Sequence, residues 1–220
     1  MSSNFLDALA GSRLYPLTDP SLSGLSHADQ VLQLSDGGAS LVQLREKNGS
    51  PAEFYAQAEE ALRIARQYGL KVIVNDRVDI ALALKADGVH LGQDDLPPEA
   101  ARRVLGPDAI IGFSTHNPSQ AEVASQMPVD YIAIGPIFAT ASKEASNSPV
   151  GLEGLRLVRQ AVGKIPLVAI GGITVENSAA VLDSGADAVA VISNIWQPAG
   201  QAPTQVRRFL AAQQVKAIPR

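Results

Sequence analysis

Short apolar runs, rich in β-branched residues, alternate along this chain with longer stretches in which apolar residues recur at helical spacing. Each run is continuously apolar, which is typical of strands that are buried on both faces of a parallel sheet. The predicted strands span residues 14–17, 40–44, 72–74, 88–91, 110–113, 131–134, 167–170 and 188–192. The predicted helices, several of which open on a proline, span residues 27–34, 51–68, 78–84, 98–105, 118–125, 152–162, 175–184 and 205–213.

Eight strands, each followed by a helix, predict an α/β fold and specifically a single (β/α)8 TIM barrel. We expect one domain over residues 1–220, with an N-terminal extension at about 1–12 and a polar C-terminal tail at about 214–220. No linker or low-complexity segment divides the chain. An open doubly wound sheet with one extra unit would show a similar pattern, so the number of strands leaves that alternative open.

The composition is that of an ordinary folded protein, with 46% hydrophobic and 18% charged residues among 220. A net charge of −4, 5% aromatic residues and no cluster of lysine and arginine argue against a nucleic-acid-binding surface. No apolar stretch reaches the ~18 residues of a membrane-spanning helix, and the absence of cysteine fits a reducing, cytoplasmic location. We expect small molecules as partners, and the sequence leaves open whether the chain forms a homo-oligomer.

Two carboxylates end neighbouring predicted strands. Asp76 follows Asn75 after the third strand, and Asp95 follows the fourth. Parallel strands that are joined by a helix end at the same edge of the sheet, so both carboxylates would face one cleft. Carboxylates together with substrate phosphates commonly bind Mg²⁺. Either aspartate alone could instead be a helix N-cap, whereas the pair favours a metal site.

Polar residues also follow the second predicted strand, in the sequence Gln43-Leu44-Arg45-Glu46-Lys47. An extended chain would place Gln43, Arg45 and Lys47 on one side, and the carboxyl ends of barrel strands carry the active site. An amide, a guanidinium fork and an ammonium group suit a pyrophosphate or a polar ring. The alternative is a solvated surface loop.

The loops after the fifth and sixth predicted strands hold further candidates. Ser114 could donate to a phosphate or cap the next helix, and His116 could be an acid or base, although a lone histidine is more often structural. Residues 135–151 form a long polar loop where other connections are short, which is typical of a lid. A surface insertion without a function is the alternative. The candidate ligand contacts in this loop are Thr140, Ser142 and Lys143.

The pair Gly171-Gly172 follows the seventh predicted strand, and Ile192-Ser193 ends the eighth. Loops at these two places often bind phosphate in α/β barrels, because glycine lets backbone N–H groups approach an anion. The chain thus offers one anion site with a metal and cations, and a second built from the backbone. Two such sites suggest transfer of a group from its diphosphate ester to an acceptor that carries a monophosphate.

At these positions the chain resembles the thiamine phosphate synthase family, from about Leu14 to Ile195. The motifs that carry the likeness are Gln43-Leu44-Arg45-Glu46-Lys47, Val74-Asn75-Asp76-Arg77, His90-Leu91-Gly92-Gln93-Asp94-Asp95, Gly112-Phe113-Ser114, Gly135-Pro136-Ile137-Phe138 and Ala169-Ile170-Gly171-Gly172-Ile173. Their order and spacing make the resemblance specific. The family joins hydroxymethylpyrimidine diphosphate to thiazole phosphate and releases pyrophosphate, so the resemblance implies a Mg²⁺-dependent transferase of thiamine biosynthesis.

The resemblance also implies roles for individual residues. The residues implied for the pyrimidine diphosphate are Gln43, Leu44, Arg45, Glu46, Lys47, Asn75, Ser114 and Lys143. Those implied for the thiazole phosphate are Thr140, Ala141, Ser142, Gly172, Ile192 and Ser193. Mg²⁺ would be held by Asp76 and Asp95. The family reaction is dissociative, so the site must stabilise departing pyrophosphate, and the catalytic candidates are Arg45, Lys143 and Ser114.

The predicted lid departs from the family pattern, which commonly reads Thr-x-Thr-Lys followed within two positions by Asp. This chain has Thr140-Ala141-Ser142-Lys143-Glu144-Ala145 instead. Ser142 keeps the hydroxyl group, so we expect binding of the thiazole phosphate to persist, whereas the missing aspartate bears on lid closure.

Two other functions stay open on the sequence. A thiazole tautomerase-like paralogue could use His116 as its acid or base, although such paralogues lack the features that Asp95 and Lys143 represent here. A phosphate-ester-binding barrel without catalysis would keep the glycine pair and the fold alone.

Overall fold

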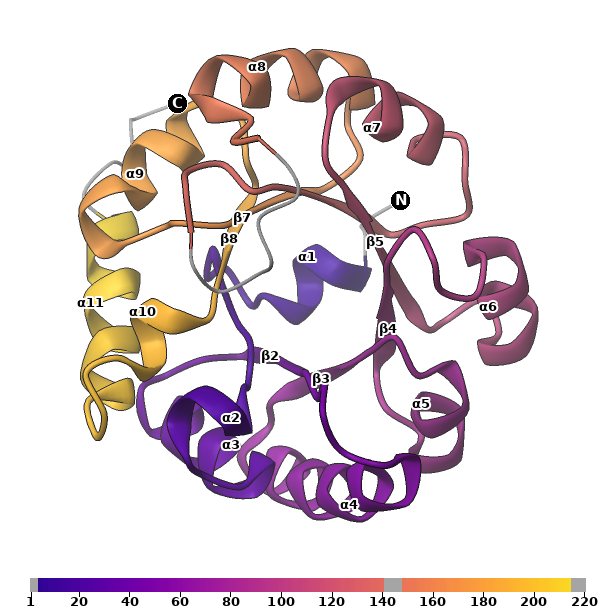
Figure 1. Cartoon of the computed structure of the whole chain (residues 1–220), viewed down its shortest axis with the longest axis vertical. Helices are drawn as coiled ribbons and strands as arrows, with labels where there is room; N and C mark the ends of the chain where they lie inside the picture. The colour runs from indigo at the N-terminus through magenta and orange to yellow at the C-terminus, as the bar shows by residue number, and fades with distance from the viewer. Residues whose placement is uncertain (1–3, 141–147, 215–220) are drawn as a thin grey trace.

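Eight parallel strands form a closed barrel that is surrounded by helices (Figure 1). The computed structural model describes residues 4–140 and 148–214. Strand β1 lies beside β8, and each of the other strands lies beside the next in chain order. A parallel bridge between Leu17 and Gln43 joins the end of β1 to β2 and closes the ring. The predicted TIM barrel is therefore confirmed, and the open sheet is excluded.

The structure gives the following bounds for the elements. The strands are β1 (Leu14–Pro16), β2 (Leu41–Leu44), β3 (Lys71–Asn75), β4 (Gly88–Leu91), β5 (Ile110–Thr115), β6 (Tyr131–Ile134), β7 (Leu167–Ile170) and β8 (Ala188–Val191). The helices are α1 (Asn4–Ala8), α2 (Pro20–Ser23), α3 (His27–Asp36), α4 (Pro51–Tyr68), α5 (Val78–Leu84), α6 (Pro98–Leu105), α7 (Pro118–Ala124), α8 (Gly151–Val162), α9 (Val175–Asp183), α10 (Ser193–Trp196) and α11 (Ala202–Gln214). Each predicted element is present within a few residues of its predicted bounds. Helices α1, α2 and α10 were not predicted.

Helix α4 shows why these boundaries could be predicted. The side chain of Ser50 accepts a hydrogen bond from the backbone N–H of Glu53, and the Glu53 carboxylate accepts one from the backbone N–H of Ser50. Pro51 supplies the first helical residue, and Gly69 ends the helix at a φ of 74°. This reciprocal cap satisfies two N–H groups that would otherwise lack partners, and the glycine adopts the left-handed conformation without strain.

Three aspartates tie neighbouring strands together at the amino-terminal end of the barrel. Each lies directly before an even-numbered strand, accepts a hydrogen bond from a backbone N–H at the start of the preceding strand, and pairs with a lysine or arginine. The three sets are Asp87 with Val72 and Lys71, Asp130 with Ile111 and Arg102, and Asp187 with Leu167 and Arg159. These aspartate clamps belong to the scaffold, because the active sites of such barrels lie at the opposite, carboxyl-terminal end of the strands.

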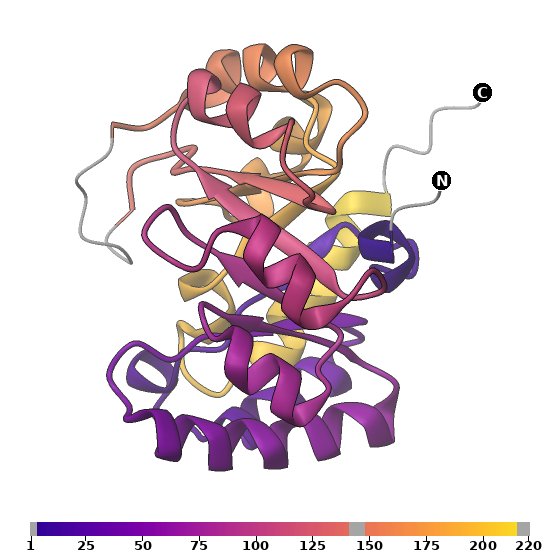
Figure 2. The same ribbon diagram turned by 90° about the vertical axis from the view of Figure 1, so that its right-hand side faces the viewer.

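Helix α1 fills the amino-terminal end of the barrel, on the side away from the loop that follows β6 (Figure 2). Phe5 is fully buried, and its ring stacks on Tyr131 with the ring centroids 4.0 Å apart. Tyr131 in turn lies over Gly112, where an added Cβ would come within 2.0 Å of its Cζ. Only glycine fits beneath this ring, so the Gly112 of the sequence motif has a packing role.

Among the described residues, no helix is long and apolar enough to cross a membrane.

Candidate active site

Two adjoining cavities open among the loops that follow the strands. The first, here called the polar cavity, has a volume of about 300 Å³, and its polar and charged lining is Tyr15, Gln43, Arg45, Lys47, Asn75, Asp76, His90, Gln93, Asp94, Asp95, Ser114 and His116. The second, the glycine cavity, has a volume of about 170 Å³, and its lining includes Thr140, Gly171, Gly172, Ile192, Ser193 and Asn194. Ser114 and His116 line both cavities. Two ligands bound there would therefore meet at a shared wall.

The cations of the polar cavity are each held by a carboxylate. Arg45 Nη1 lies 2.7 Å from Asp19 Oδ2, and Lys47 Nζ lies 2.5 Å from Asp76 Oδ2. Asp19 caps helix α2 through the backbone N–H of Leu22, so this short helix fixes the carboxylate that orients Arg45. Strand β2 ends at Leu44, yet Gln43, Arg45 and Lys47 all line the cavity, as their alternation in the sequence predicted.

The two predicted metal ligands lie in the same cavity. The carboxylate of Asp95 accepts a hydrogen bond of 2.7 Å from the backbone N–H of Gly92. Burial raises the pKa of Asp95, and the nearby Asp76 carboxylate adds to the rise. Asp76 itself has a φ of 62°, a left-handed conformation that is strained for a residue other than glycine and that often occurs at functional sites. The fold thus keeps the carboxylates of Asp76 and Asp95 close together at a cost in conformational and electrostatic free energy.

Asn75 is the last residue of β3, and it lines the polar cavity. It is 7% exposed, and its Nδ2 is buried without a hydrogen-bond partner among the described residues. A buried amide donor that is left unpaired costs about 1–3 kcal/mol. Since Asn75 lines the cavity, a ligand acceptor would satisfy this donor. The orphaned amide is the clearest sign that the cavity is built to hold a polar ligand.

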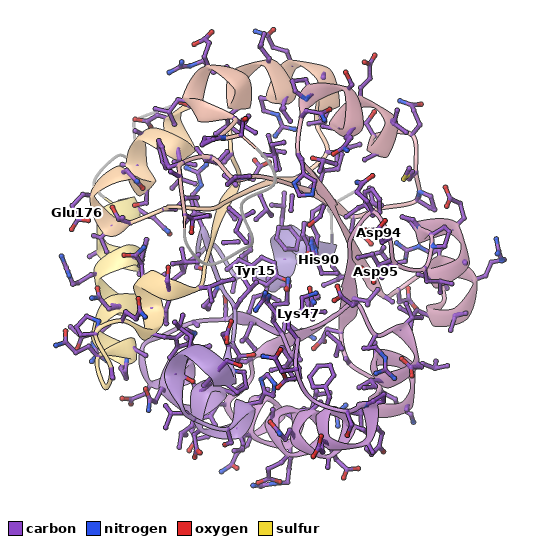
Figure 3. All side chains as sticks on the ribbon, viewed as in Figure 1. Tyr15, Lys47, His90, Asp94, Asp95 and Glu176 are labelled. Carbon is purple, nitrogen blue, oxygen red and sulfur yellow. The ribbon has the colours of Figure 1, made fainter. Side chains whose placement is uncertain are left out.

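His90 is a functional candidate that the sequence reasoning missed. It lies on β4, lines the polar cavity and is 8% exposed. Its Nε2 is 2.8 Å from Ser114 Oγ, and its Nδ1 is 2.9 Å from the hydroxyl of Tyr131. Figure 3 shows His90, Tyr15 and Lys47 in the middle of the barrel with Asp94 and Asp95 beside them. The sequence signal that could have identified His90 is its position as a polar residue within the apolar run that predicts β4.

The glycine cavity contains the residues that were predicted to hold a phosphate at β7 and β8. Gly172 has a φ of 65°, and an added Cβ would lie 2.7 Å from both Ala139 O and Phe138 Cβ. The backbone of the loop after β6 therefore packs directly against Gly172, and no side chain would fit there. Thr140, Ile192 and Ser193 line the same cavity. His116 lies at its edge and donates from Nδ1 to the Gly135 carbonyl at 2.8 Å.

Not all predicted site residues line a cavity. Leu44 is fully buried in the core, and the carboxylate of Glu46 accepts from the backbone N–H groups of Asn48 and Gly49. The side chains of these two residues therefore turn away from both cavities, and their ligand contacts stay a prediction. Ala141, Ser142 and Lys143 lie outside the described residues, so their roles also stay predictions.

Comparison with known proteins gives one consistent result. A family model described as thiamine monophosphate synthase matches residues 14–195. A thiamine-phosphate synthase from Chloroflexus aurantiacus is 46% identical over 209 residues, which are 94% of this chain and 96% of the relative. Another from Koribacter versatilis is 49% identical over 190 residues, or 83% and 88% of the two chains. The solved structure of thiamine phosphate pyrophosphorylase from Pyrococcus furiosus is 36% identical, covers 91% of this chain and 94% of its own, and has a TM-score of 0.81.

Proposed function

The chain belongs to the thiamine monophosphate synthase family and is a transferase, and we propose that it couples hydroxymethylpyrimidine diphosphate to thiazole phosphate in a Mg²⁺-dependent reaction. The products are thiamine phosphate and pyrophosphate. The observation that carries this proposal is the pair of adjoining cavities, one lined by cations and carboxylates and the other by glycines, with Ser114 in the wall between them.

The charges in the polar cavity explain why a divalent cation fits there. Arg45 and Lys47 face three aspartates among the lining residues, namely Asp76, Asp94 and Asp95. A diphosphate would meet a net negative surface unless a cation lay between, and Mg²⁺ is usually held by one or two carboxylates plus substrate phosphates. Among the described residues, no group of three or more histidine, cysteine, aspartate or glutamate side chains could hold a metal alone. Asp76 and Asp95 would therefore share the ion with the diphosphate.

The protein's own groups would stabilise the leaving pyrophosphate. Bound Mg²⁺ supplies charge neutralisation at the phosphate oxygens. Arg45 is held 2.7 Å from Asp19 and is thereby oriented before any ligand arrives, which favours electrostatic stabilisation without reorganisation. The unpaired Nδ2 of Asn75 can donate to an oxygen of the same ligand. We expect Lys143 to add a further charge from the lid.

The glycine cavity would hold the acceptor by its phosphate group. The backbone at Gly172 and Ser193 offers close approach to an anion, as glycine-containing loops after the last two strands do in other barrels. The acceptor's ring nitrogen would then lie at the shared wall near Ser114, facing the carbon from which pyrophosphate departs. The reaction needs no general base, because a neutral thiazole nitrogen attacks without losing a proton.

The test is to mix the purified protein with both substrates and Mg²⁺ and to measure thiamine phosphate. We expect product with Mg²⁺, none after chelation with EDTA, and recovery when Mg²⁺ is restored. Asp95→Asn should lower kcat by about 100-fold or more, whereas Asp36→Asn, an exposed aspartate on α3, should change nothing. Absence of product from freshly purified wild-type protein would refute the proposal.

The tautomerase alternative predicts a different result at His116. Its Nδ1 is already committed to the Gly135 carbonyl at 2.8 Å, which favours an orienting role in the cavity wall. Replacement His116→Ala should leave the coupling reaction measurable under the proposed function. Loss of an isomerase activity on the thiazole phosphate in the same variant, without any coupling by the wild type, would favour the alternative.

A further inference from the structure

A continuous chain of hydrogen bonds crosses the barrel beneath the polar cavity. It connects Gln43 Nε2 to the Tyr15 hydroxyl at 3.0 Å, and that hydroxyl to the Tyr131 hydroxyl at 3.0 Å. Tyr131 contacts His90 Nδ1 at 2.9 Å, and His90 Nε2 contacts Ser114 Oγ at 2.8 Å. These side chains come from β2, β1, β6, β4 and β5. Gln43 and Ser114, the two ends, line the polar cavity together with Tyr15 and His90, so the chain links its polar contacts to one another.

The direction of this chain follows from the number of protons that each group can donate. A tyrosine hydroxyl has one proton, and a neutral imidazole has one donor nitrogen and one acceptor nitrogen. Gln43 Nε2 donates to Tyr15, and the buried Tyr15 hydroxyl has no other acceptor than Tyr131 among the described residues, so donation to Tyr131 is the direction that pairs its proton. Tyr131 then donates its own proton to His90 Nδ1. Burial raises the pKa of Tyr15 and of Tyr131 well above the usual range, so both hydroxyls keep their protons.

The two ends of the chain therefore have opposite polarity. His90 carries its proton on Nε2 and donates it to Ser114 Oγ, which leaves the Ser114 hydroxyl proton for a ligand. Gln43 uses Nε2 within the chain, and its Oε1 forms no hydrogen bond with the described residues. The cavity thus presents an acceptor at Gln43 and a donor at Ser114. Reversing the bond between the two tyrosines would also reverse both bonds at His90 and would leave the buried Tyr15 proton without an acceptor among the described residues.

We propose that Tyr15 and Tyr131 are positioning residues that fix this polarity and thereby make the polar cavity specific for a heterocycle with an amino group beside a ring nitrogen. The inference rests on the function proposed above. An amino group donates to Gln43 Oε1, and a ring nitrogen accepts from Ser114. An otherwise identical ring with a carbonyl in place of the amino group would set two acceptors against each other at Gln43. A site with buried, fixed polar groups rejects such an analogue strongly.

The surroundings of the tyrosines keep the chain in one arrangement. Phe5 stacks on Tyr131 and lies edge-on to Tyr15 with centroids 5.8 Å apart, which closes the lower side of the chain. Tyr15 and Tyr131 are both fully buried. Gly112 leaves the space that the Tyr131 ring occupies. This packing belongs to the buried core, and it also fixes the positions of the two hydroxyl groups.

The first test needs no substrate. In protein labelled with ¹⁵N at histidine, the imidazole nitrogens of the three histidines can be observed by NMR at neutral pH and assigned with His27→Asn and His116→Asn. We expect His90 to show a protonated Nε2 and an unprotonated Nδ1. A proton on Nδ1, or on both nitrogens, would mean that the chain runs in the other direction and would overturn the inference.

The second test separates the two tyrosines. Tyr131→Phe keeps the ring against Phe5 but removes the donor to His90, so we expect His90 to lose its single tautomer. Tyr15→Phe should leave that tautomer intact, because Tyr131 can still donate, while the Gln43 amide becomes free to rotate. Both variants should lower kcat/KM for the aminopyrimidine diphosphate by about tenfold, the effect of one neutral hydrogen bond, and should leave KM for the thiazole phosphate unchanged.

The matched control is Tyr68→Phe, a tyrosine that is 52% exposed at the end of α4. It should change neither the His90 tautomer nor the kinetics. The wild type should have a higher kcat/KM for the aminopyrimidine diphosphate than for the analogue with a carbonyl in place of the amino group. In Tyr15→Phe and Tyr131→Phe this ratio should fall by about tenfold, and an unchanged ratio in both variants would overturn the inference. If the wild type forms thiamine phosphate but carries a proton on His90 Nδ1, this inference is wrong and the proposed function stands. Failure of the wild type to form thiamine phosphate overturns the proposed function, and the NMR result then still decides the direction of the chain.

Discussion

His27, the first residue of α3, makes the stability of this protein depend on pH. Its side chain is fully buried, with Nδ1 2.7 Å from the Thr18 hydroxyl and no hydrogen-bond partner for Nε2 among the described residues. Burial lowers the pKa of His27 from 6.5 to about 4, and the charges of Glu46 and Asp19 only partly oppose this shift. At neutral pH the 3.7 Å contact with Glu46 is therefore a contact with an uncharged imidazole.

The size of the effect follows from the two pKa values. In the unfolded chain His27 gains a proton below pH 6.5, whereas in the folded protein it does so only near pH 4. The unfolded state binds the extra proton between these values, so stability falls as the pH falls. At 1.36 kcal/mol per unit, the loss is about 2 kcal/mol at pH 5 and about 3 kcal/mol when the lower pKa is reached.

The measurement is urea unfolding of the wild type and of His27→Asn at pH 7.5, 6.5, 5.5 and 5.0. The carboxylates away from this contact titrate alike in both proteins, so the difference between the two curves reports His27 together with its contact to Glu46. The variant should lose about 2 kcal/mol less than the wild type between pH 7.5 and pH 5.0. Parallel curves for the wild type and His27→Asn would refute the assignment of a lowered pKa.

Three further predictions concern the scaffold. Asp130→Ala removes one aspartate clamp: Arg102 loses its carboxylate partner but keeps its bonds to backbone carbonyls, and the Ile111 N–H loses its acceptor. Urea unfolding should show a loss of about 1–3 kcal/mol with kcat unchanged; a large fall in kcat at full stability would contradict this. Gly112→Ala places a Cβ 2.0 Å from the Tyr131 Cζ and should cost about 1–3 kcal/mol or more, with a changed near-ultraviolet circular dichroism signal from the displaced ring. Phe5→Ala leaves a cavity under Tyr131 and should cost about 3–5 kcal/mol, measured as a lower thermal midpoint; an unchanged midpoint would mean that α1 does not seal the barrel.

The sequence was sufficient to predict the barrel because its strands are buried on both faces. A run such as residues 167–170 stays apolar throughout, so each strand stands out against the helical pattern around it. The polar residues that follow the strands were then found at one edge by topology alone. Arg45, Lys47, Asp76 and Asp95 line one cavity for this reason.

What the sequence could not predict depends on contacts between distant segments. Helices α1, α2 and α10 have 5, 4 and 4 residues, which are too few for a helical period to appear. The role of His90 depends on Tyr131, which is 41 residues away and buried on another strand. Nothing in the sequence indicated that the Glu46 carboxylate accepts from backbone N–H groups of its own loop, because that contact depends on how the loop turns after β2.

The closure of the barrel has a consequence for the order in which the protein can fold during synthesis. Strand β1 is made first, yet its pairing partner is β8, with Leu14 opposite Val189. Tyr15 likewise cannot form its hydrogen bond with Tyr131 until that residue, 116 positions later in the chain, has been made. Contacts of such long sequence separation form late. The N-terminal segment beneath the two cavities can meet β2 early through Leu17 and Gln43, but it completes its pairing with β8 and its contact with Tyr131 only after those segments have been made.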